Sequence, residues 1–392
     1  MTIESTIRSR LSQRVQDVPP SGIRKFFDVL AAMPDVISLG VGEPDFDTPA
    51  SIKQAGIDAL IAGRTQYTSN YGTMELREAL SAHLDRRYAV RYDPGSEMLI
   101  TVGGSEALAI AMQAVVDPGD EVVLAEPSYV AYVPDIIFSG GSAVYVATRP
   151  EDGWQLDPDA VEAAITPRTK VLFLGYPCNP TGAVLEPEVR RQLADIALRH
   201  DLLVISDEVY DRLVYGGHRH EAFSSLPGMR ERTILLGGFS KSYAMTGWRV
   251  GYACAPADLL EGMLKIHQYI IMSAPTMSQD AADHAFTVPD DEFERMRPEY
   301  YRSRGKNLKC LDRMGLPAVE PRGAFYAFPR IAGTGLSSEE FSERLLREQQ
   351  VAVIPGSAFG PSGEGYVRAA LATSYEDLEE ALVRIERFLD SL

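Results

Sequence analysis

A lysine and an arginine eight residues apart form a candidate reaction centre. Lys241 follows the apolar run Ile234–Leu236, which predicts a buried strand. Most lysines are solvated surface charges, but the carboxyl end of a buried strand is where open α/β sheets hold ligands. Burial lowers the pKa of a lysine, so that its amine can form a Schiff base with an aldehyde, and Arg249 could bind a phosphate. An aldehyde that carries a phosphate suggests pyridoxal phosphate.

Three polar side chains follow other apolar runs. Asp207 comes just after the run Leu202–Ile205, and a buried carboxylate requires a positive partner, such as a protonated pyridine nitrogen. Tyr210 could reach the oxygen of the same ring. Asn179 precedes Pro-Thr-Gly, which is a turn signal. Its amide is therefore either part of a turn only or a hydrogen-bond donor to a phenolate oxygen.

Two glycine-rich segments are candidate binding loops. Gly104 and Ser105 lie between a predicted strand and a predicted helix, and the N–H groups at a helix N-terminus bind phosphate readily. A plain strand-to-helix turn would look the same. The loop Gly40–Pro49 is rich in Gly, Pro and Asp, so it either connects two domains or lines a site, and Gly42 is its candidate ligand contact.

Apolar runs alternate with helical patterns from about Met98, which predicts an α/β fold with a mostly parallel, doubly wound, seven-stranded sheet. After about Ala285 the pattern becomes that of a small α+β domain. We expect a large domain at residues 45–285 and a small domain formed by residues 1–44 and 286–392. The predicted strands are Leu99–Val102, Val122–Leu124, Ala143–Val146, Val171–Leu174, Leu202–Ile205, Ile234–Leu236 and Val250–Ala253, then Ala324–Phe328, Val351–Ile354 and Tyr366–Ala370; the predicted helices include Ala107–Val116, Pro187–His200, Asp258–Tyr269, Glu294–Asp312 and a short one through Ile23, Phe26, Phe27 and Leu30.

The composition excludes several classes of function. The chain of 392 residues carries 38 Lys and Arg against 55 Asp and Glu, a net charge of -17 that disfavours nucleic acid or an anionic membrane as partner. Three distant cysteines offer neither a disulfide framework nor a metal motif, and His218 and His220 have no third ligand in view. With no signal peptide and no membrane span in the sequence, we expect a cytoplasmic protein without a metal.

These motifs together resemble the class I aminotransferases, which are fold type I enzymes that depend on pyridoxal phosphate. The resemblance rests on Asn179-Pro-Thr-Gly, on Asp207-x-x-Tyr210, and on Ser240-Lys241 with Arg249. It extends from the Gly-Glu-Pro-Asp-Phe-Asp-Thr-Pro loop to Tyr-Val-Arg368. Within the class, the chain is most similar to the bacterial and archaeal branch that holds aromatic, alanine and aspartate aminotransferases.

The resemblance implies catalytic roles for three residues. Lys241 would bind the cofactor through a Schiff base and later move a proton at the substrate α-carbon. Asp207 would keep the pyridine nitrogen protonated, so that the ring can act as an electron sink. Tyr210 and Asn179 would hydrogen-bond the ring oxygen, and Asn179 would also contact the substrate.

The resemblance also implies how the cofactor is held. Arg249, Ser240 and the backbone at Gly104 and Ser105 would bind its phosphate. Tyr129 would stack on the ring, although a tyrosine at this position is as often a core aromatic.

Substrate binding and assembly follow from the same resemblance. Arg368 would grip the substrate α-carboxylate, with Gly42 beside it. Tyr67 would reach the phosphate of a neighbouring subunit's cofactor, so the active enzyme should be a homodimer. Cis peptide bonds are expected before Pro127 and Pro180.

The expected reaction is amino transfer from an L-amino acid to a 2-oxo acid such as 2-oxoglutarate, in two half-reactions. Ser105 stands where aspartate-using relatives can carry a cation, so an aromatic or other apolar amino acid is expected. Gly238 replaces a serine found in some relatives, which leaves Ser240 for the phosphate. Aspartate or alanine as substrate, lyase chemistry on the same cofactor and, more remotely, a non-catalytic regulator remain as alternatives.

Overall fold

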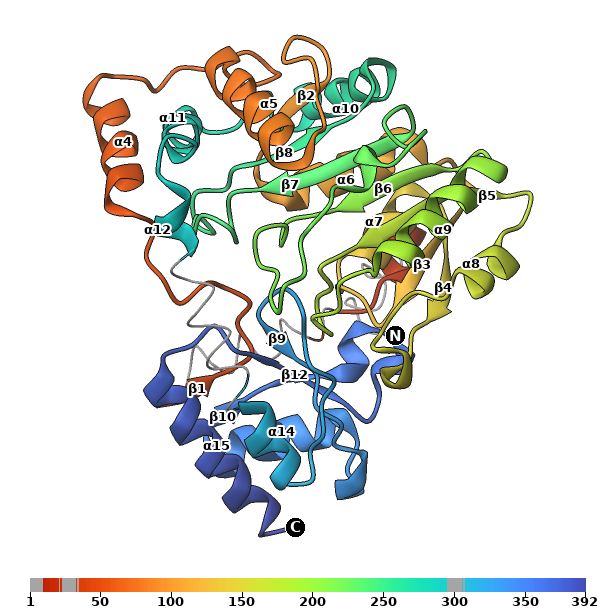
Figure 1. The fold of residues 1–392 in the computed structure, drawn as a ribbon, viewed down its shortest axis with the longest axis vertical. Helices are drawn as coiled ribbons and strands as arrows, with labels where there is room; N and C mark the ends of the chain where they lie inside the picture. Colours follow the sequence, from red (N-terminus) through yellow and green to blue (C-terminus); the bar gives the residue numbers. More distant parts are fainter. Residues whose placement is uncertain (1–9, 21, 23–32, 34, 295–304, 306) are drawn as a thin grey trace.

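The computed structural model describes residues 10–20, 22, 33, 35–294, 305 and 307–392 (Figure 1). At its centre is a seven-stranded sheet in the order β2-β8-β7-β6-β5-β3-β4. The pairs between β7 and β4 along this order are parallel, whereas β8 runs antiparallel to both β7 and β2. The predicted mostly parallel sheet is therefore confirmed. Its strands are β2 (Met98–Thr101), β3 (Glu121–Glu126), β4 (Ser142–Ala147), β5 (Thr169–Gly175), β6 (Leu203–Asp207), β7 (Thr233–Gly238) and β8 (Gly251–Cys254).

Alternate side chains of the strands enter different cores, because successive residues of a strand point to opposite faces. In β3, Val122 and Leu124 pack with helices α6, α7 and α10, whereas Val123 and Ala125 pack with α8 and α9. Both faces of the sheet are thus covered, which makes it doubly wound. The helices around it are α4 (Ala50–Ile61), α5 (Met74–Tyr88), α6 (Gly103–Val115), α7 (Tyr132–Ser139), α8 (Pro158–Ala164), α9 (Pro187–Arg199), α10 (Ala257–Ile270), α11 (Thr276–Ala285) and α12 (Asp290–Glu294).

Strand β1, from the N-terminal part of the chain, and the C-terminal part meet in a second, smaller region, drawn in red and blue in Figure 1. Strand β1 (Ile37–Ser38) pairs in parallel with β10 (Val351–Ala352). A three-stranded antiparallel sheet has the order β11-β12-β9. The remaining elements are α2 (Gln13–Asp17), which contacts α7, then β9 (Tyr326–Ala327), α14 (Ser338–Gln349), β11 (Ile354–Pro355), β12 (Val367–Ala370), α15 (Tyr375–Leu389) and the short 3-10 turns Pro150–Asp152, Phe223–Ser225, Ala332–Thr334, Gly356–Phe359 and Pro361–Gly363.

One strand prediction is wrong in detail. The run Val351–Ile354 is not one strand, because the chain leaves the first small sheet after Ala352 and joins the second at Ile354. The predicted strand Ala324–Phe328 is also shorter in the structure. The predicted helix through Ile23, Phe26, Phe27 and Leu30, and most of Glu294–Asp312, lie outside the described residues.

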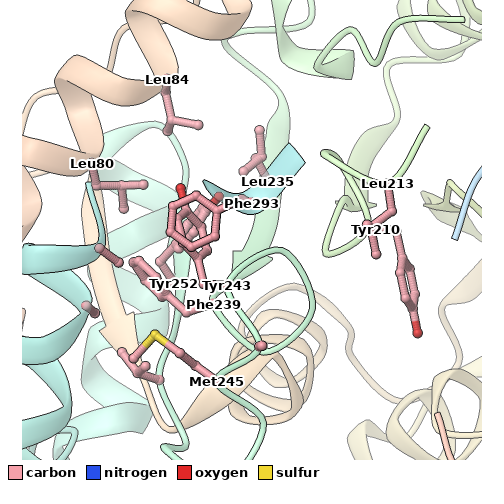
Figure 2. Packing of buried hydrophobic residues seen from close by; sticks show 14 of the residues in the cluster. Leu80, Leu84, Tyr210, Leu213, Leu235, Phe239, Tyr243, Met245, Tyr252 and Phe293 are labelled. Carbon is pink, nitrogen blue, oxygen red and sulfur yellow. The ribbon is translucent and has the colours of Figure 1, made fainter. Parts of the chain in front are cut away.

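Aromatic side chains form the core beside the candidate site. Figure 2 shows Phe239, Tyr243 and Tyr252 packed together, with Tyr210 to one side and its hydroxyl directed away from them. Cis bonds precede Pro127 and Pro180, as expected, and also Pro177. None of the helices in the described part of the chain is long and apolar enough to cross a membrane.

Candidate active site

The residues predicted from the motifs converge on one cavity of about 330 Å³. It lies where the carboxyl ends of β6 and β7 and the N-terminus of α6 face the smaller region. Eight separate stretches of the chain supply its wall. Of the predicted site residues, it is lined by Gly42, Gly104, Ser105, Tyr129, Asn179, Asp207, Tyr210, Ser240, Lys241, Arg249 and Arg368.

Lys241 lies three residues after the end of β7, with its amine in the cavity. The amine donates a hydrogen bond to the carbonyl of Gly42. Burial lowers the pKa of the Lys241 amine to about 8; the Glu43 carboxylate opposes this shift, and the cations of Arg368 and Arg249 add to it. An appreciable fraction of the amine is therefore uncharged near neutral pH, as a nucleophile requires.

Asp207 is the last residue of β6 and faces the same cavity. Its carboxylate accepts hydrogen bonds from the Tyr132 hydroxyl at 2.8 Å and from the backbone N–H of Val209 at 3.3 Å. Burial raises the pKa of Asp207 to about 6, although both hydrogen bonds oppose the rise. A cation placed against Asp207 would lower this pKa again, so the carboxylate is suited to a positively charged ligand atom.

Tyr210 places its hydroxyl 2.8 Å from the hydroxyl of Tyr326, which comes from β9. Both side chains are buried, and burial raises the pKa of Tyr210 well above its ordinary value. Tyr210 therefore stays protonated and can serve as a hydrogen-bond donor to a ligand oxygen.

A second cationic position lies at the N-terminus of α6. A Cβ on Gly103 would come within 2.6 Å of the Arg249 guanidinium, and a Cβ on Gly251 would come within 2.7 Å of the Gly104 nitrogen. Only glycines allow the helix terminus, β8 and Arg249 to approach so closely. Free N–H groups, the helix dipole and the hydroxyls of Ser105 and Ser240 then surround one end of the cavity, an arrangement suited to a phosphate.

Arg368, from β12, is 2% exposed and lines the opposite part of the cavity. Its guanidinium donates to the Asn179 side-chain oxygen at 2.9 Å and to the Gly40 carbonyl at 2.6 Å. Its Nε is buried and has no hydrogen-bond partner among the described residues. A buried donor without a partner costs free energy, so an additional acceptor at this nitrogen would be favourable.

The two remaining aromatic predictions differ in outcome. Tyr129 lines the cavity and meets Tyr132 edge to face, with the ring centroids 5.5 Å apart. Tyr67 does not line this cavity and is 80% exposed. The structure thus brings together every predicted site residue except Tyr67.

The lining residues that the sequence analysis did not identify include Glu43, Tyr132 and Tyr326. Tyr132 lies three residues after Tyr129 in the sequence and could have been found from that spacing. No local signal marks Tyr326. His220, considered for a metal, instead contacts the Glu208 carboxylate at 2.6 Å, and within the described ranges no group of three or more metal-ligating side chains occurs.

Comparison with known proteins identifies the family of the chain. The family model of aminotransferase class I and II matches residues 34–385. An aspartate aminotransferase from Pyrococcus abyssi is 47% identical, and an aromatic-amino-acid aminotransferase 2 from Thermococcus litoralis is 45% identical; each comparison covers 97% of this chain and 98% of the relative. The crystal structure of an aromatic aminotransferase from Pyrococcus horikoshii has a TM-score of 0.89 at 46% identity, over 93% of this chain and 98% of that one. The chain therefore belongs to the class I and II aminotransferases, enzymes that transfer amino groups.

Proposed function

We propose that this aminotransferase uses pyridoxal 5'-phosphate, bound in the cavity around Lys241. The observation that carries the proposal is the set of donors and acceptors along that cavity. An amine with a lowered pKa, a carboxylate suited to a cation and a cationic helix terminus match the aldehyde, the pyridine nitrogen and the phosphate of one molecule. The residues present therefore fit the cofactor.

Each residue has a distinct task in this proposal. Bound pyridoxal phosphate supplies an electron sink for negative charge at the substrate α-carbon. Lys241 binds the cofactor and then acts as the base that moves the α-proton. Asp207 holds a proton on the pyridine nitrogen, and Tyr210 and Asn179 donate to the ring oxygen.

In this proposal, the two ends of the cavity bind different groups. Arg249, Ser240 and the backbone at Gly104 and Ser105 hold the phosphate, while Tyr129 covers the ring. At the other end, a substrate α-carboxylate takes the donors of Arg368, with Asn179 and Gly42 beside it. Two fixed anion positions hold cofactor and substrate in one relative orientation.

We infer an aromatic or other apolar L-amino acid as one substrate, with glutamate and 2-oxoglutarate as the other pair. Lys241, Arg249 and Arg368 are the cations of the described lining, and each already has a task. A second carboxylate on the substrate is thus left without a cation from these residues, since Ser105 is neutral. Aspartate is the second candidate, because one relative is named an aspartate aminotransferase.

Assembly and location complete the proposal. A homodimer is supported by the exposure of Tyr67 and of the apolar side chains Tyr269 and Ile270. We infer a cytoplasmic location. We also infer a large domain at residues 45–285 and a small domain from 1–44 and 286–392, supported by the pairing of β1 with β10.

The absorption spectrum of the protein reconstituted with pyridoxal phosphate tests the cofactor. A band at about 420 nm is expected in the wild type and not in Lys241→Ala. Addition of a substrate amino acid should convert it to a band at about 330 nm. Absence of the first band contradicts the proposed cofactor. A band that no amino acid converts, with ammonia released, would indicate a lyase instead.

Steady-state kinetics test the substrate. With 2-oxoglutarate as acceptor, kcat/KM for phenylalanine is expected to exceed that for aspartate. The reverse order would replace the apolar substrate by the acidic one without affecting the cofactor assignment.

A further inference from the structure

Tyr326 contacts several residues of the site, although it belongs to none of the sequence motifs. The side chain is 1% exposed and lines the cavity. The charged and titratable groups that act on it are Arg368, Tyr210 and Glu43. It therefore lies between the part of the cavity that we assign to the substrate and the part that we assign to the cofactor ring.

The donor of the hydrogen bond between Tyr326 and Tyr210 is fixed once Tyr210 donates its own proton to a ligand. The two hydroxyls are 2.8 Å apart, and each carries one proton. If Tyr210 donates its proton to an oxygen of the cofactor, it can only accept from Tyr326. A donor that itself accepts a hydrogen bond becomes stronger, so Tyr326 increases the effect of Tyr210 on the cofactor.

The ring of Tyr326 supports the other end of the site. The guanidinium carbon of Arg368 lies 4.5 Å from the ring centroid, which is within the range of a cation–π contact. The hydroxyl also approaches Gly42 so closely that a Cβ there would lie 2.4 Å from it. This explains why glycine is needed at position 42.

We propose that Tyr326 is a positioning residue. Its hydroxyl donates a hydrogen bond to Tyr210, and its ring holds the Arg368 guanidinium in place through a cation–π contact. One side chain thus aligns the groups that bind the cofactor and the group that binds the substrate. This inference rests on the proposed function, because Tyr210 needs a ligand oxygen to fix the direction of the hydrogen bond. It adds a residue, and a link between the two ends of the cavity, to that function.

The first test uses the pH dependence of the 420-nm band in the holoenzyme without substrate. Tyr326→Phe keeps the ring and removes the donor. Negative charge on the cofactor oxygen is then stabilised less, so the neighbouring proton is lost less readily. The pH midpoint of the band should rise by about 0.5 to 1 unit. Tyr145→Phe removes a hydroxyl from exposed β4 outside the cavity and should not shift the midpoint.

A double-mutant cycle separates positioning from a general structural role. If Tyr326 acts through Tyr210, then Tyr326→Phe should cause no further shift in a Tyr210→Phe background. A shift of equal size in both backgrounds would overturn the proposal. Incorporation of 3-fluorotyrosine at position 326 preserves the side chain and should lower the midpoint, since a more acidic phenol donates more strongly; an unchanged midpoint would contradict the proposal even if Tyr326→Phe failed to fold.

The second test uses 3-phenylpropionate, a carboxylate without an amino group. Tyr326→Leu should weaken its binding about tenfold, because Arg368 loses the ring beneath it, whereas Tyr326→Phe should stay within about twofold. Equal binding to Tyr326→Leu and wild type would overturn the role toward Arg368. If the wild type never forms the 420-nm band, the proposed function fails and this inference with it; a normal wild-type band with unshifted variants rejects this inference alone.

Discussion

Burial and the neighbouring carboxylates act in opposite directions on the pKa of the Lys241 amine. A lysine with its ordinary pKa of 10.5 is almost entirely protonated at pH 7, whereas a pKa of about 8 leaves about one amine in ten uncharged. Glu43 is the first carboxylate to oppose the shift, and it lies in the same cavity wall. The sequence motif names the lysine, but the packing around it makes the lysine reactive.

The rate at which apoenzyme binds pyridoxal phosphate should therefore rise with pH, with a midpoint near pH 8. Glu43→Gln removes a charge that favours the protonated amine, so its midpoint should move to lower pH. Stopped-flow absorbance at about 420 nm measures this rate. Asp47→Asn, at an exposed carboxylate that pairs with Lys53, serves as the control and should leave the midpoint in place. An upward shift in Glu43→Gln would contradict the electrostatic account.

Tyr132 should matter through Asp207. Its hydroxyl lowers the pKa of that carboxyl, so Tyr132→Phe should raise the pKa above its present value of about 6. Asp207 would then bind a proton more strongly itself and keep the pyridine nitrogen charged less effectively. We expect kcat/KM to fall about tenfold at pH 7 and the acidic limb of its pH profile to move to higher pH. Tyr366→Phe, at a ring that stacks on Phe328 outside the cavity, is the control.

At the scale of the secondary-structure elements, β8 packs tightly against the start of α6. This contact fixes the position of the helix N-terminus that we assign to the phosphate. A methyl group on Gly251 would overlap the backbone of Gly103 and Gly104. Gly251→Ala should thus displace the helix terminus, destabilise the protein by about 1 to 3 kcal/mol and weaken cofactor binding at least tenfold. Thermal unfolding and cofactor titration measure both effects.

Gly262→Ala in α10 is the matched control for this prediction. Its added methyl group would meet Ala114 at an ordinary 3.8 Å, and alanine favours a helix more than glycine does. It should raise stability by up to about 1 kcal/mol and leave cofactor affinity unchanged. If both variants lost cofactor affinity equally, the close approach at Gly251 would not be the cause.

The strands could be predicted because each is an apolar run long enough to cross the core, such as Val122–Leu124 or Val171–Leu174. Asp207 and Lys241 could be predicted because each follows such a run within a few residues. The interruption of the predicted strand Val351–Ile354 at Val353 could not be predicted. It depends on which of the two small sheets each half of that segment joins. The apolar pattern of a segment indicates that it is buried, but it does not indicate which strand the segment pairs with.

Tyr326 could not be predicted for a related reason. It lies 116 residues from Tyr210 in the chain, and their hydroxyls meet only because β9 faces the end of β6 across the cavity. Within its strand it resembles any other buried aromatic residue. Contacts between distant elements carry no local sequence signal, whereas a residue within a motif does.

On the scale of the whole molecule, the exposed apolar side chains Tyr269, Ile270, Ile271 and Met272 follow one another at the end of α10. The loop that carries Tyr67 is nearby, because the Thr276 hydroxyl donates to the Gln66 carbonyl at 2.6 Å. A second copy of the chain would bury these groups and bring Tyr67 to the other active site. This is the surface that the proposed homodimer would use.

Ile270→Asp should therefore convert dimer to monomer and lower kcat at least tenfold, because each site would lose the partner's contribution. Sedimentation velocity measures the assembly. Val383→Asp places the same charge at an exposed apolar position of α15 and should leave the dimer intact. A monomeric wild type, or a dimeric Ile270→Asp enzyme with full activity, would contradict the assignment of this surface.

The backbone carbonyls of Gly40 and Gly42 accept hydrogen bonds from two cations of the cavity. One accepts from Arg368 and the other from Lys241, so these buried cations have polar partners before any ligand enters. For Arg368, binding of a carboxylate is then an exchange of one acceptor for another, and the guanidinium need not lose all its partners at any stage. If Arg368 binds the substrate α-carboxylate, as proposed, its affinity for that group is a difference between two sets of hydrogen bonds, to which the Nε, unpartnered among the described residues, would add one donor.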